Sequence, residues 1–211
     1  MAIAIIDYGA GNLTSVRLAL EALGIAGEIT SEPERVRCAE RVIFPGVGAA
    51  GAAMRRLRDS GLAEAIRDVV RRGTPFLGIC LGTQILFDCS EEDGGTVCLG
   101  LAPGRVRRFR PRNRTDKVPQ MGWNSVRQAR RHVLFDGIED GSEFYFVHSY
   151  YPEPADAAWI IGETEYAGVE FAAAIGRGHV AATQFHPEKS GRVGLRLLEN
   201  FCRWQPAGAT C

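Results

Sequence analysis

The sequence predicts an α/β protein built on a doubly wound, mixed β-sheet. Short apolar runs without alternation occur early in the chain, segments with helical spacing separate them, and turn-linked β-rich segments fill the second half. Buried strands that alternate with helices form parallel βαβ units, whereas strands joined by turns pair antiparallel. At 211 residues, 45% hydrophobic and 24% charged, the chain suits a single domain, which we place at residues 1–205.

The first half supplies the parallel part of the sheet. Residues 2–6 are a continuous apolar run, which indicates a strand buried on both faces. Apolar residues then recur with nearly helical spacing from Leu13 to Leu23, and Gly24 ends that helix. Further strands are predicted near 26–30, at 41–44 and at 74–79, and further helices at 50–59 and 62–72.

The second half lacks a long helix until about 190–203. We interpret its β-rich segments as an antiparallel continuation of the same sheet with a covering ribbon. These segments lie near 105–109, 123–127, 143–149, 157–162, 168–175 and 179–185. Residues 206–211 are expected to form a frayed tail.

Composition and motifs exclude several function classes. Because 25 basic residues balance 25 acidic ones, a nucleic-acid-coating surface is not expected. No apolar run approaches the roughly 18 residues of a membrane helix, and the N-terminus lacks a signal peptide, so a cytoplasmic location is predicted. The six cysteines form no CxxC pair, and no P-loop or G-x-G-x-x-G motif follows the first strand, so neither a metal nor a cofactor is expected.

One of these cysteines occupies a strand-to-helix turn. Gly78-Ile-Cys-Leu-Gly82 has the form G-x-C-x-G, in which the nucleophile stands out from a sharp turn and the glycines let neighbouring backbone pass. The start of a helix favours the thiolate of Cys80, and the Leu81 N–H is placed to stabilise an oxyanion. Taken alone, the motif also fits a small buried residue where a strand meets a helix.

A base and its orienting carboxylate lie far downstream, in Gln184-Phe-His-Pro-Glu-Lys189. A thiol nucleophile needs a base, and the base needs a group that orients it. In an extended chain His186 and Glu188 project to the same side, and Pro187 favours that geometry. Glu188 can then hold one imidazole nitrogen while the other faces Cys80. The alternative, an exposed His-Pro-Glu turn, is disfavoured by the G-x-C-x-G motif in the same chain.

Together these motifs resemble those of the class I, or triad, glutamine amidotransferases, and the resemblance runs nearly the length of the chain. The cysteine and histidine motifs are shared by the whole class and indicate only the chemistry. Other segments are more discriminating and are similar to the glutaminase subunits of imidazole glycerol phosphate synthases. These segments are DYGAGN (7–12), MGWN (121–124) and FVHSY (146–150), and PGVG (45–48) matches the family as well. The resemblance implies a flavodoxin-like core with an antiparallel extension.

The resemblance implies hydrolysis of L-glutamine through a thioester on Cys80, with His186 as base and acid and Glu188 as its orienter. It implies the backbone N–H groups of Val47 and Leu81 as oxyanion donors, and a Val47 segment able to flip between its flanking glycines. The implied glutamine-binding residues are Gly46, Gly48, Gln84, Ser149 and Tyr150. On residue type alone, Gln84 also fits an ordinary polar position on a helix surface, and Ser149 and Tyr150 also fit the end of a strand.

A partner protein is implied as well. Ammonia is mostly protonated at neutral pH, when it is no nucleophile, so it must reach its acceptor protected from water. The implied partner is the (β/α)8-barrel cyclase subunit, in a heterodimer that makes imidazole glycerol phosphate and aminoimidazole carboxamide ribotide in histidine biosynthesis. Its expected contacts are Asn12, Trp123, Tyr145 and Lys189. Alternatively, the tryptophan is a core residue and the lysine a solvated one.

Three features leave questions open. Thr83 and Gln120 stand where the family often has Met and His; little effect is expected from the first, and the second is expected near the partner surface. The arginine-rich stretch from Arg105 to Arg114 also fits a phosphate site, although a solvated, ion-paired segment is favoured.

The rival functions are a glutaminase for a pyridoxal phosphate or anthranilate synthase, a non-catalytic binding module, and a cysteine peptidase.

Overall fold

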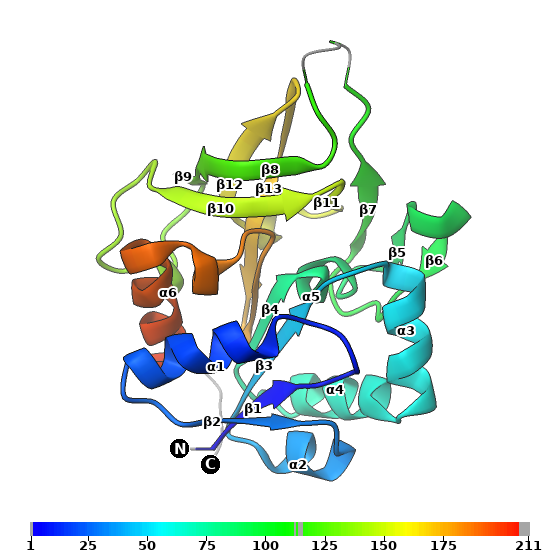
Figure 1. Ribbon diagram of the computed structural model, residues 1–211, viewed down its shortest axis with the longest axis vertical. Helices are drawn as coiled ribbons and strands as arrows, with labels where there is room; N and C mark the ends of the chain where they lie inside the picture. Colours follow the sequence, from blue (N-terminus) through cyan, green and yellow to red (C-terminus); the bar gives the residue numbers. More distant parts are fainter. Residues whose placement is uncertain (1, 112, 114–115, 207–211) are drawn as a thin grey trace.

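The core of the molecule is a mixed eight-stranded sheet (Figure 1). The computed structural model describes residues 2–111, 113 and 116–206. The sheet is parallel from β2 to β14 and antiparallel from there to β9. In spatial order its strands are β2 (Gly27–Thr30), β1 (Ile3–Ile6), β3 (Arg41–Gly46), β4 (Phe76–Cys80), β14 (Val180–Thr183), β13 (Val169–Arg177), β12 (Ile160–Tyr166) and β9 (Arg127–Gln128).

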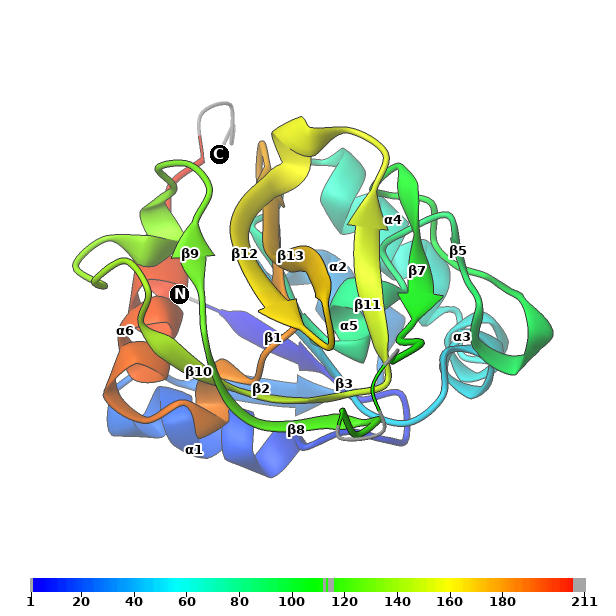
Figure 2. The ribbon, with the colours of Figure 1, turned by 90° about the horizontal axis from the view of Figure 1, so that it is seen from above.

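Helices cover both faces of the parallel part (Figure 2). Alternate residues of β1 show this directly, since Ala4 and Ile6 belong to one apolar cluster and Ile3 and Ile5 to the other. The first cluster contains the buried residues of α2 (Pro33–Cys38), α3 (Ala50–Asp59) and α4 (Leu62–Arg71). The second contains those of α1 (Leu13–Ala22) and α6 (Gly191–Arg203). The predicted doubly wound α/β fold is therefore confirmed.

Two smaller sheets lie beyond the core. The strands β10 (Glu143–His148) and β8 (Gln120–Ser125) pair antiparallel in a two-stranded ribbon, which corresponds to the predicted covering ribbon. A four-stranded sheet was not predicted, and its order is β11 (Tyr150–Pro154), β7 (Gly104–Arg108), β5 (Cys89–Ser90) and β6 (Thr96–Val97). The segment predicted as one strand at 143–149 thus ends at His148, and the chain continues into a different sheet from Tyr150.

Other expectations differ in detail from the structure. The segment expected as a strand at 157–162 begins as a 3-10 turn, Ala157–Trp159, because the Asp156 side chain accepts from the Ala158 N–H and caps it. The helix after Cys80, α5, spans only Leu81–Gln84. Helix α2 is six residues long, too short to show an apolar period. The predicted tail lies outside the described residues except for Pro206.

Within the described part of the chain, none of the helices combines the length and apolar character that crossing a bilayer requires.

Candidate active site

Cys80 ends β4 in a strained backbone conformation. Its φ of 56° lies in the left-handed region, which residues with a Cβ seldom adopt, and α5 begins at the next residue. The glycines around it lie close to neighbouring backbone: a Cβ on Gly82 would lie 1.9 Å from the Phe44 carbonyl oxygen, and one on Gly78 would lie 2.8 Å from the Gly82 oxygen. The predicted reason for the G-x-C-x-G glycines is confirmed.

His186 and Glu188 form a buried pair. Imidazole Nδ1 lies 2.8 Å from carboxylate Oε1, and the two side chains are 2% and 1% exposed. The route to this contact differs from the prediction. His186 is extended, but Pro187–Lys189 is a 3-10 turn, so the carboxylate returns to the imidazole around a turn and not along a strand.

The sulfur of Cys80 keeps His186 in its charged form. Burial by itself lowers the pKa of the imidazole, but the adjacent Cys80 sulfur and the Glu188 carboxylate outweigh burial and raise it to about 10. An imidazolium next to a sulfur favours the thiolate, which is the reactive form of cysteine. The structure therefore brings together, from two distant motifs, the side chains predicted to act as nucleophile, base and orienting carboxylate.

A cavity of about 380 Å³ opens over the sulfur. Its rim includes most residues expected to bind substrate, but Gly46 is absent from it and lies instead against the backbone of Gly82. The lining residues are Val47, Gly48, Cys80, Leu81, Gln84, Glu92, Pro119, Val147, His148, Ser149, Tyr150 and His186. Among the described residues no group of three or more His, Cys, Asp or Glu side chains is arranged to hold a metal ion.

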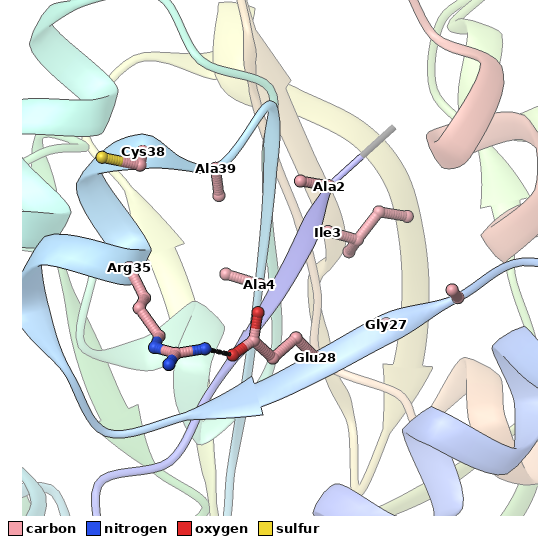
Figure 3. A pocket seen from close by; sticks show the side chains of 9 residues that line it. Ala2, Ile3, Ala4, Gly27, Glu28, Arg35, Cys38 and Ala39 are labelled. Carbon is pink, nitrogen blue, oxygen red and sulfur yellow. Dashed lines mark hydrogen bonds and ion pairs between the residues drawn. The ribbon is translucent and has the colours of Figure 1, made fainter.

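A second hollow, of about 410 Å³, lies at the opposite edge of the sheet, among the first residues of β1 and β2 and the end of α2 (Figure 3). An ion pair between Arg35 and Glu28 crosses it, and Cys38 lies at its rim. None of the predicted site residues lines it, and the chemistry is concentrated in the cavity at Cys80.

The comparisons with known proteins agree with this site. A family model described as glutamine amidotransferase class-I matches residues 4–204. The chain belongs to the class I glutamine amidotransferases. This amidotransferase is 53% identical to the imidazole glycerol phosphate synthase subunit HisH of Herpetosiphon aurantiacus, over 94% of this chain and 92% of that protein. The Moorella thermoacetica protein of the same name is 54% identical, over 94% and 93%.

Solved structures give the same fold. A structure titled PurLQS from Thermotoga maritima superimposes with a TM-score of 0.72, at 18% identity, over 95% of this chain and 97% of that one. A crystal structure titled glutamine amidotransferase has the same TM-score at 18% identity, over 94% and 96%. These likenesses concern the fold, and they confirm the amidotransferase fold class that the motifs predicted.

One expected oxyanion donor of this amidotransferase is already engaged. The Val47 N–H donates to the Tyr8 hydroxyl at 3.0 Å, and the same hydroxyl donates to the Val47 carbonyl at 2.9 Å. Burial raises the pKa of Tyr8, so the hydroxyl keeps the proton that it donates. In this conformation Val47 lines the cavity but does not offer a free N–H to it. The Val47 N–H is engaged by a side chain from the DYGAGN segment, for which no such role was predicted.

The expected substrate residues meet at the other end of the cavity. Gln84 is 4% exposed, and its Nε2 donates to the Tyr150 carbonyl and to Gln184 Oε1, both at 2.9 Å. It is thus a buried, hydrogen-bonded residue and not part of a polar helix surface. Ser149 and Tyr150 lie where β10 passes into β11, and both line the cavity, so a position between strands and a place at the candidate substrate site occur together.

Three of the four expected partner residues form one surface. Trp123 and Tyr145 are cross-strand neighbours with rings 6.1 Å apart, and Lys189 Nζ lies 6.0 Å from the Tyr145 ring centre. Trp123 is 55% exposed, which excludes a core position. Asn12 precedes α1, which packs beside the 3-10 turn that carries the lysine.

The two departures from the family pattern are both buried. Thr83 donates to the Thr183 carbonyl at 2.6 Å and so ties α5 to β14. Gln120 begins β8, the strand that carries Trp123, and its side chain is 3% exposed, so it lies beneath the expected partner surface. In the arginine-rich stretch, Arg105 and Arg107 pair with Glu153, as an ion-paired strand predicts, while positions 112 and 114 lie outside the described residues.

His148 is a site residue that sequence reasoning missed. It is 6% exposed, and its Nδ1 lies 2.7 Å from the Tyr150 carbonyl, so Nδ1 carries the proton. Burial, offset in part by that bond and reinforced by the charge of His186, lowers the pKa of His148 to about 4. The imidazole is therefore neutral at physiological pH. Its signal in the sequence was only its place within FVHSY.

This lowered pKa makes stability sensitive to acid. Between about pH 6.5 and 4 the unfolded chain gains a proton that folded His148 does not bind, so the free energy of unfolding falls as the pH falls through that window. His148→Asn keeps a donor for the Tyr150 carbonyl. We expect the fall in its free energy of unfolding between pH 6.5 and 4 to be smaller than that of the wild type by on the order of 3 kcal/mol. Urea unfolding at a series of pH values measures it; parallel curves for the two proteins would contradict a neutral His148.

Proposed function

We propose that this chain is the glutaminase subunit of an imidazole glycerol phosphate synthase. The observation that carries the proposal is the buried His186–Glu188 pair beside Cys80 in an open cavity, in a chain more than 50% identical to proteins of that name. The reaction is hydrolysis of L-glutamine to glutamate and ammonia, and the ammonia passes to a cyclase subunit.

The first half of the reaction forms a thioester. The Cys80 thiolate attacks the side-chain amide carbon of glutamine, the C–S bond forms, and negative charge moves to the amide oxygen. The His186 imidazolium gives its proton to the amide nitrogen, the C–N bond breaks, and ammonia leaves. Glu188 holds Nδ1 and balances the charge of the imidazolium, as its 2.8 Å contact allows.

The second half releases glutamate. Neutral His186 takes a proton from water, whose oxygen attacks the thioester carbon. The C–S bond then breaks, and the thiolate and imidazolium are restored. Gln84, Gly48, Ser149 and Tyr150 line the space that the rest of the glutamine would occupy.

The oxyanion of both halves needs backbone donors. The Leu81 N–H follows the nucleophile directly, and the Val47 N–H becomes the second donor only when it leaves Tyr8. Gly48 has a φ of +91° with open space around it, so the backbone after Val47 has room to turn. A hole completed only in the assembled enzyme would prevent idle hydrolysis.

The partner is a (β/α)8-barrel cyclase in a heterodimer. The exposed Trp123, the adjoining Tyr145 and Lys189 offer an aromatic and cationic surface of the kind that anchors protein interfaces. This surface connects directly to the residue of the catalytic base, because the backbone N–H of His186 donates to the Tyr145 carbonyl at 2.9 Å. Asn12 would lie at the edge of the same contact.

Reconstitution tests this function. The chain is mixed with a cyclase subunit and its phosphoribulosyl-formimino ribonucleotide, with glutamine as nitrogen donor, and the formation of imidazole glycerol phosphate is followed. We expect product only when both subunits are present. Product with an anthranilate or pyridoxal phosphate synthase subunit instead, and none with the cyclase, would overturn the proposal in favour of another amidotransferase.

Glu188→Gln should weaken glutaminase turnover without abolishing it. The amide can still approach Nδ1, but the charge that supports the imidazolium is lost, so we expect a fall in kcat of about 10- to 1000-fold with little change in KM. Steady-state glutamate release by the reconstituted complex measures this. Glu199→Gln on α6, a surface carboxylate paired with Arg196 and Arg203, is the matched control. Equal activity of Glu188→Gln and wild type would exclude the carboxylate from the mechanism.

A further inference from the structure

A buried glutamine lies behind the nucleophile. Gln184 has no exposed surface, does not line the cavity, and is two residues from His186. Its Oε1 accepts from Gln84 Nε2 at 2.9 Å, and its own Nε2 lies 3.7 Å from Cys80 Sγ, within donor distance of a sulfur. Both ends of the amide are therefore engaged, one with a substrate-site residue and one with the nucleophile.

A backbone carbonyl sets the direction of these bonds. The Tyr150 carbonyl can only accept, and it accepts from Gln84 Nε2 and from His148 Nδ1. Gln84 must therefore turn its NH2 group toward the Tyr150 carbonyl, and the same nitrogen also contacts the Gln184 side chain. Gln184 in turn must present its oxygen to Gln84, which leaves its NH2 group facing the sulfur. Side-chain amides are otherwise ambiguous in orientation, but here the chain of contacts has one consistent assignment.

We propose that Gln184 is a positioning residue that stabilises the Cys80 thiolate through an N–H donor, whose direction is set by the relay from the Tyr150 carbonyl through Gln84. A thiolate is a better acceptor than a thiol, so a fixed donor favours the charged form. The proposal deepens the proposed function, because it concerns the nucleophile of that reaction. Gln184 touches the sulfur but not the cavity, so it acts through Cys80.

The surrounding backbone holds this donor in place. The Gln184 N–H donates to the Ala173 carbonyl at 2.8 Å, which fixes the residue against β13. Next to it, Thr183 accepts from the Thr83 hydroxyl at 2.6 Å and donates its own hydroxyl to the Phe185 carbonyl at 3.0 Å. A side chain held this way loses little further entropy when the thiolate forms.

The sulfur needs such a donor because its other surroundings are mixed. The Val147 carbonyl oxygen lies 3.9 Å from Sγ and presents the negative end of its dipole, which disfavours a thiolate. Among the described residues, the titratable side chains around Cys80 include His186 and the uncharged Tyr8, which interact electrostatically with the sulfur, and Glu92 and the neutral His148, which line the same cavity. Gln184 adds a neutral donor that does not change with pH.

The test is the pH dependence of Cys80 alkylation by iodoacetamide, followed by mass spectrometry of the peptide that contains Cys80, since the exposed Cys38 and Cys89 would react too. Gln184→Met keeps the length of the side chain and removes the donor. We expect the midpoint of its alkylation profile to lie about one pH unit above that of the wild type. Gln184→Glu has nearly the shape of glutamine but brings a carboxylate toward the thiolate, so its midpoint should shift further in the same direction.

Gln128→Met is the matched control. The Nε2 of Gln128 likewise donates a hydrogen bond, to the Ile138 carbonyl at 2.9 Å, but this residue lies on the edge strand β9, away from Cys80. Its profile should match the wild type. In glutamine hydrolysis at pH 7, Gln184→Met should lower kcat about tenfold and leave KM nearly unchanged, with the loss recovering toward pH 9.

Profiles of Gln184→Met and Gln184→Glu that coincide with the wild type would overturn the proposal. Circular dichroism and unfolding curves show whether each variant is folded; if Gln184→Met does not fold, Gln184→Glu alone decides. The alkylation readout needs neither cyclase nor ribonucleotide. A shifted profile in a chain that fails to support imidazole glycerol phosphate synthesis would therefore sustain this inference while the proposed function fails.

Discussion

Cys80→Ala is expected to abolish glutamine hydrolysis while leaving ammonia-dependent synthesis by the complex intact. The substitution removes the atom that forms the thioester, and no other described thiol adjoins His186. Loss of a nucleophile that acts together with its base commonly costs about 10⁴-fold or more in kcat. The cyclase reaction does not use this residue, so added ammonium salt should restore product formation to the wild-type level.

The measurement is product formation with glutamine and, separately, with ammonium chloride at pH 8.5. Cys98→Ala is the matched control, because Cys98 is also buried but burial raises the pKa of its thiol to about 12, which makes it unreactive. It should retain activity with both nitrogen donors. Glutamine hydrolysis by Cys80→Ala at more than a few per cent of the wild-type rate would refute the thioester mechanism.

Tyr8→Phe is expected to raise glutaminase activity in the absence of the partner. The hydroxyl makes two hydrogen bonds to Val47, at 3.0 and 2.9 Å, and these engage the N–H that we propose as an oxyanion donor. Two such bonds contribute about 1–3 kcal/mol, so their loss should raise the partner-free kcat about 5- to 150-fold. Activation by the cyclase and its ligand should fall by a similar factor, because part of the rearrangement no longer needs the partner.

Glutamate release by the isolated chain measures this gain. Tyr166→Phe is the matched control: it also removes a tyrosine hydroxyl that donates to a backbone carbonyl, that of Lys117 at 2.7 Å, but leaves Val47 untouched. It should not raise the partner-free rate. A Tyr8→Phe protein as inactive alone as the wild type would show that the Tyr8 hydroxyl does not restrain the oxyanion donor.

The parts of the site that the sequence predicted are those governed by local rules. The elbow at Cys80 requires small neighbours, and a Cβ on Gly82 would indeed collide with the Phe44 carbonyl. The His186–Glu188 contact was expected from a two-residue spacing, and the contact exists, although a 3-10 turn and not a strand produces it. Proline fits both geometries, since it fixes only its own φ, and the sequence alone did not separate them.

The parts that sequence reasoning missed depend on contacts between distant segments. The Tyr8 hydroxyl meets Val47 across 39 residues, and Gln184 meets Cys80 across 104. Residue type gives no sign of either contact, because tyrosine and glutamine serve equally well on a surface. The four-stranded sheet escaped prediction for a related reason: β5 and β6 have two residues each, too few for a period-two pattern.

Glutamate release from glutamine, measured for this chain alone, with the cyclase subunit, and with the cyclase subunit and its ribonucleotide, tests the account most directly. The structure places the triad side chains together but engages the Val47 N–H, so we expect slow release by the isolated chain and a rise of about 10²-fold or more in the full mixture. Full activity of the chain alone would contradict the restrained oxyanion hole. Absence of glutamate release in every mixture would contradict the glutaminase itself.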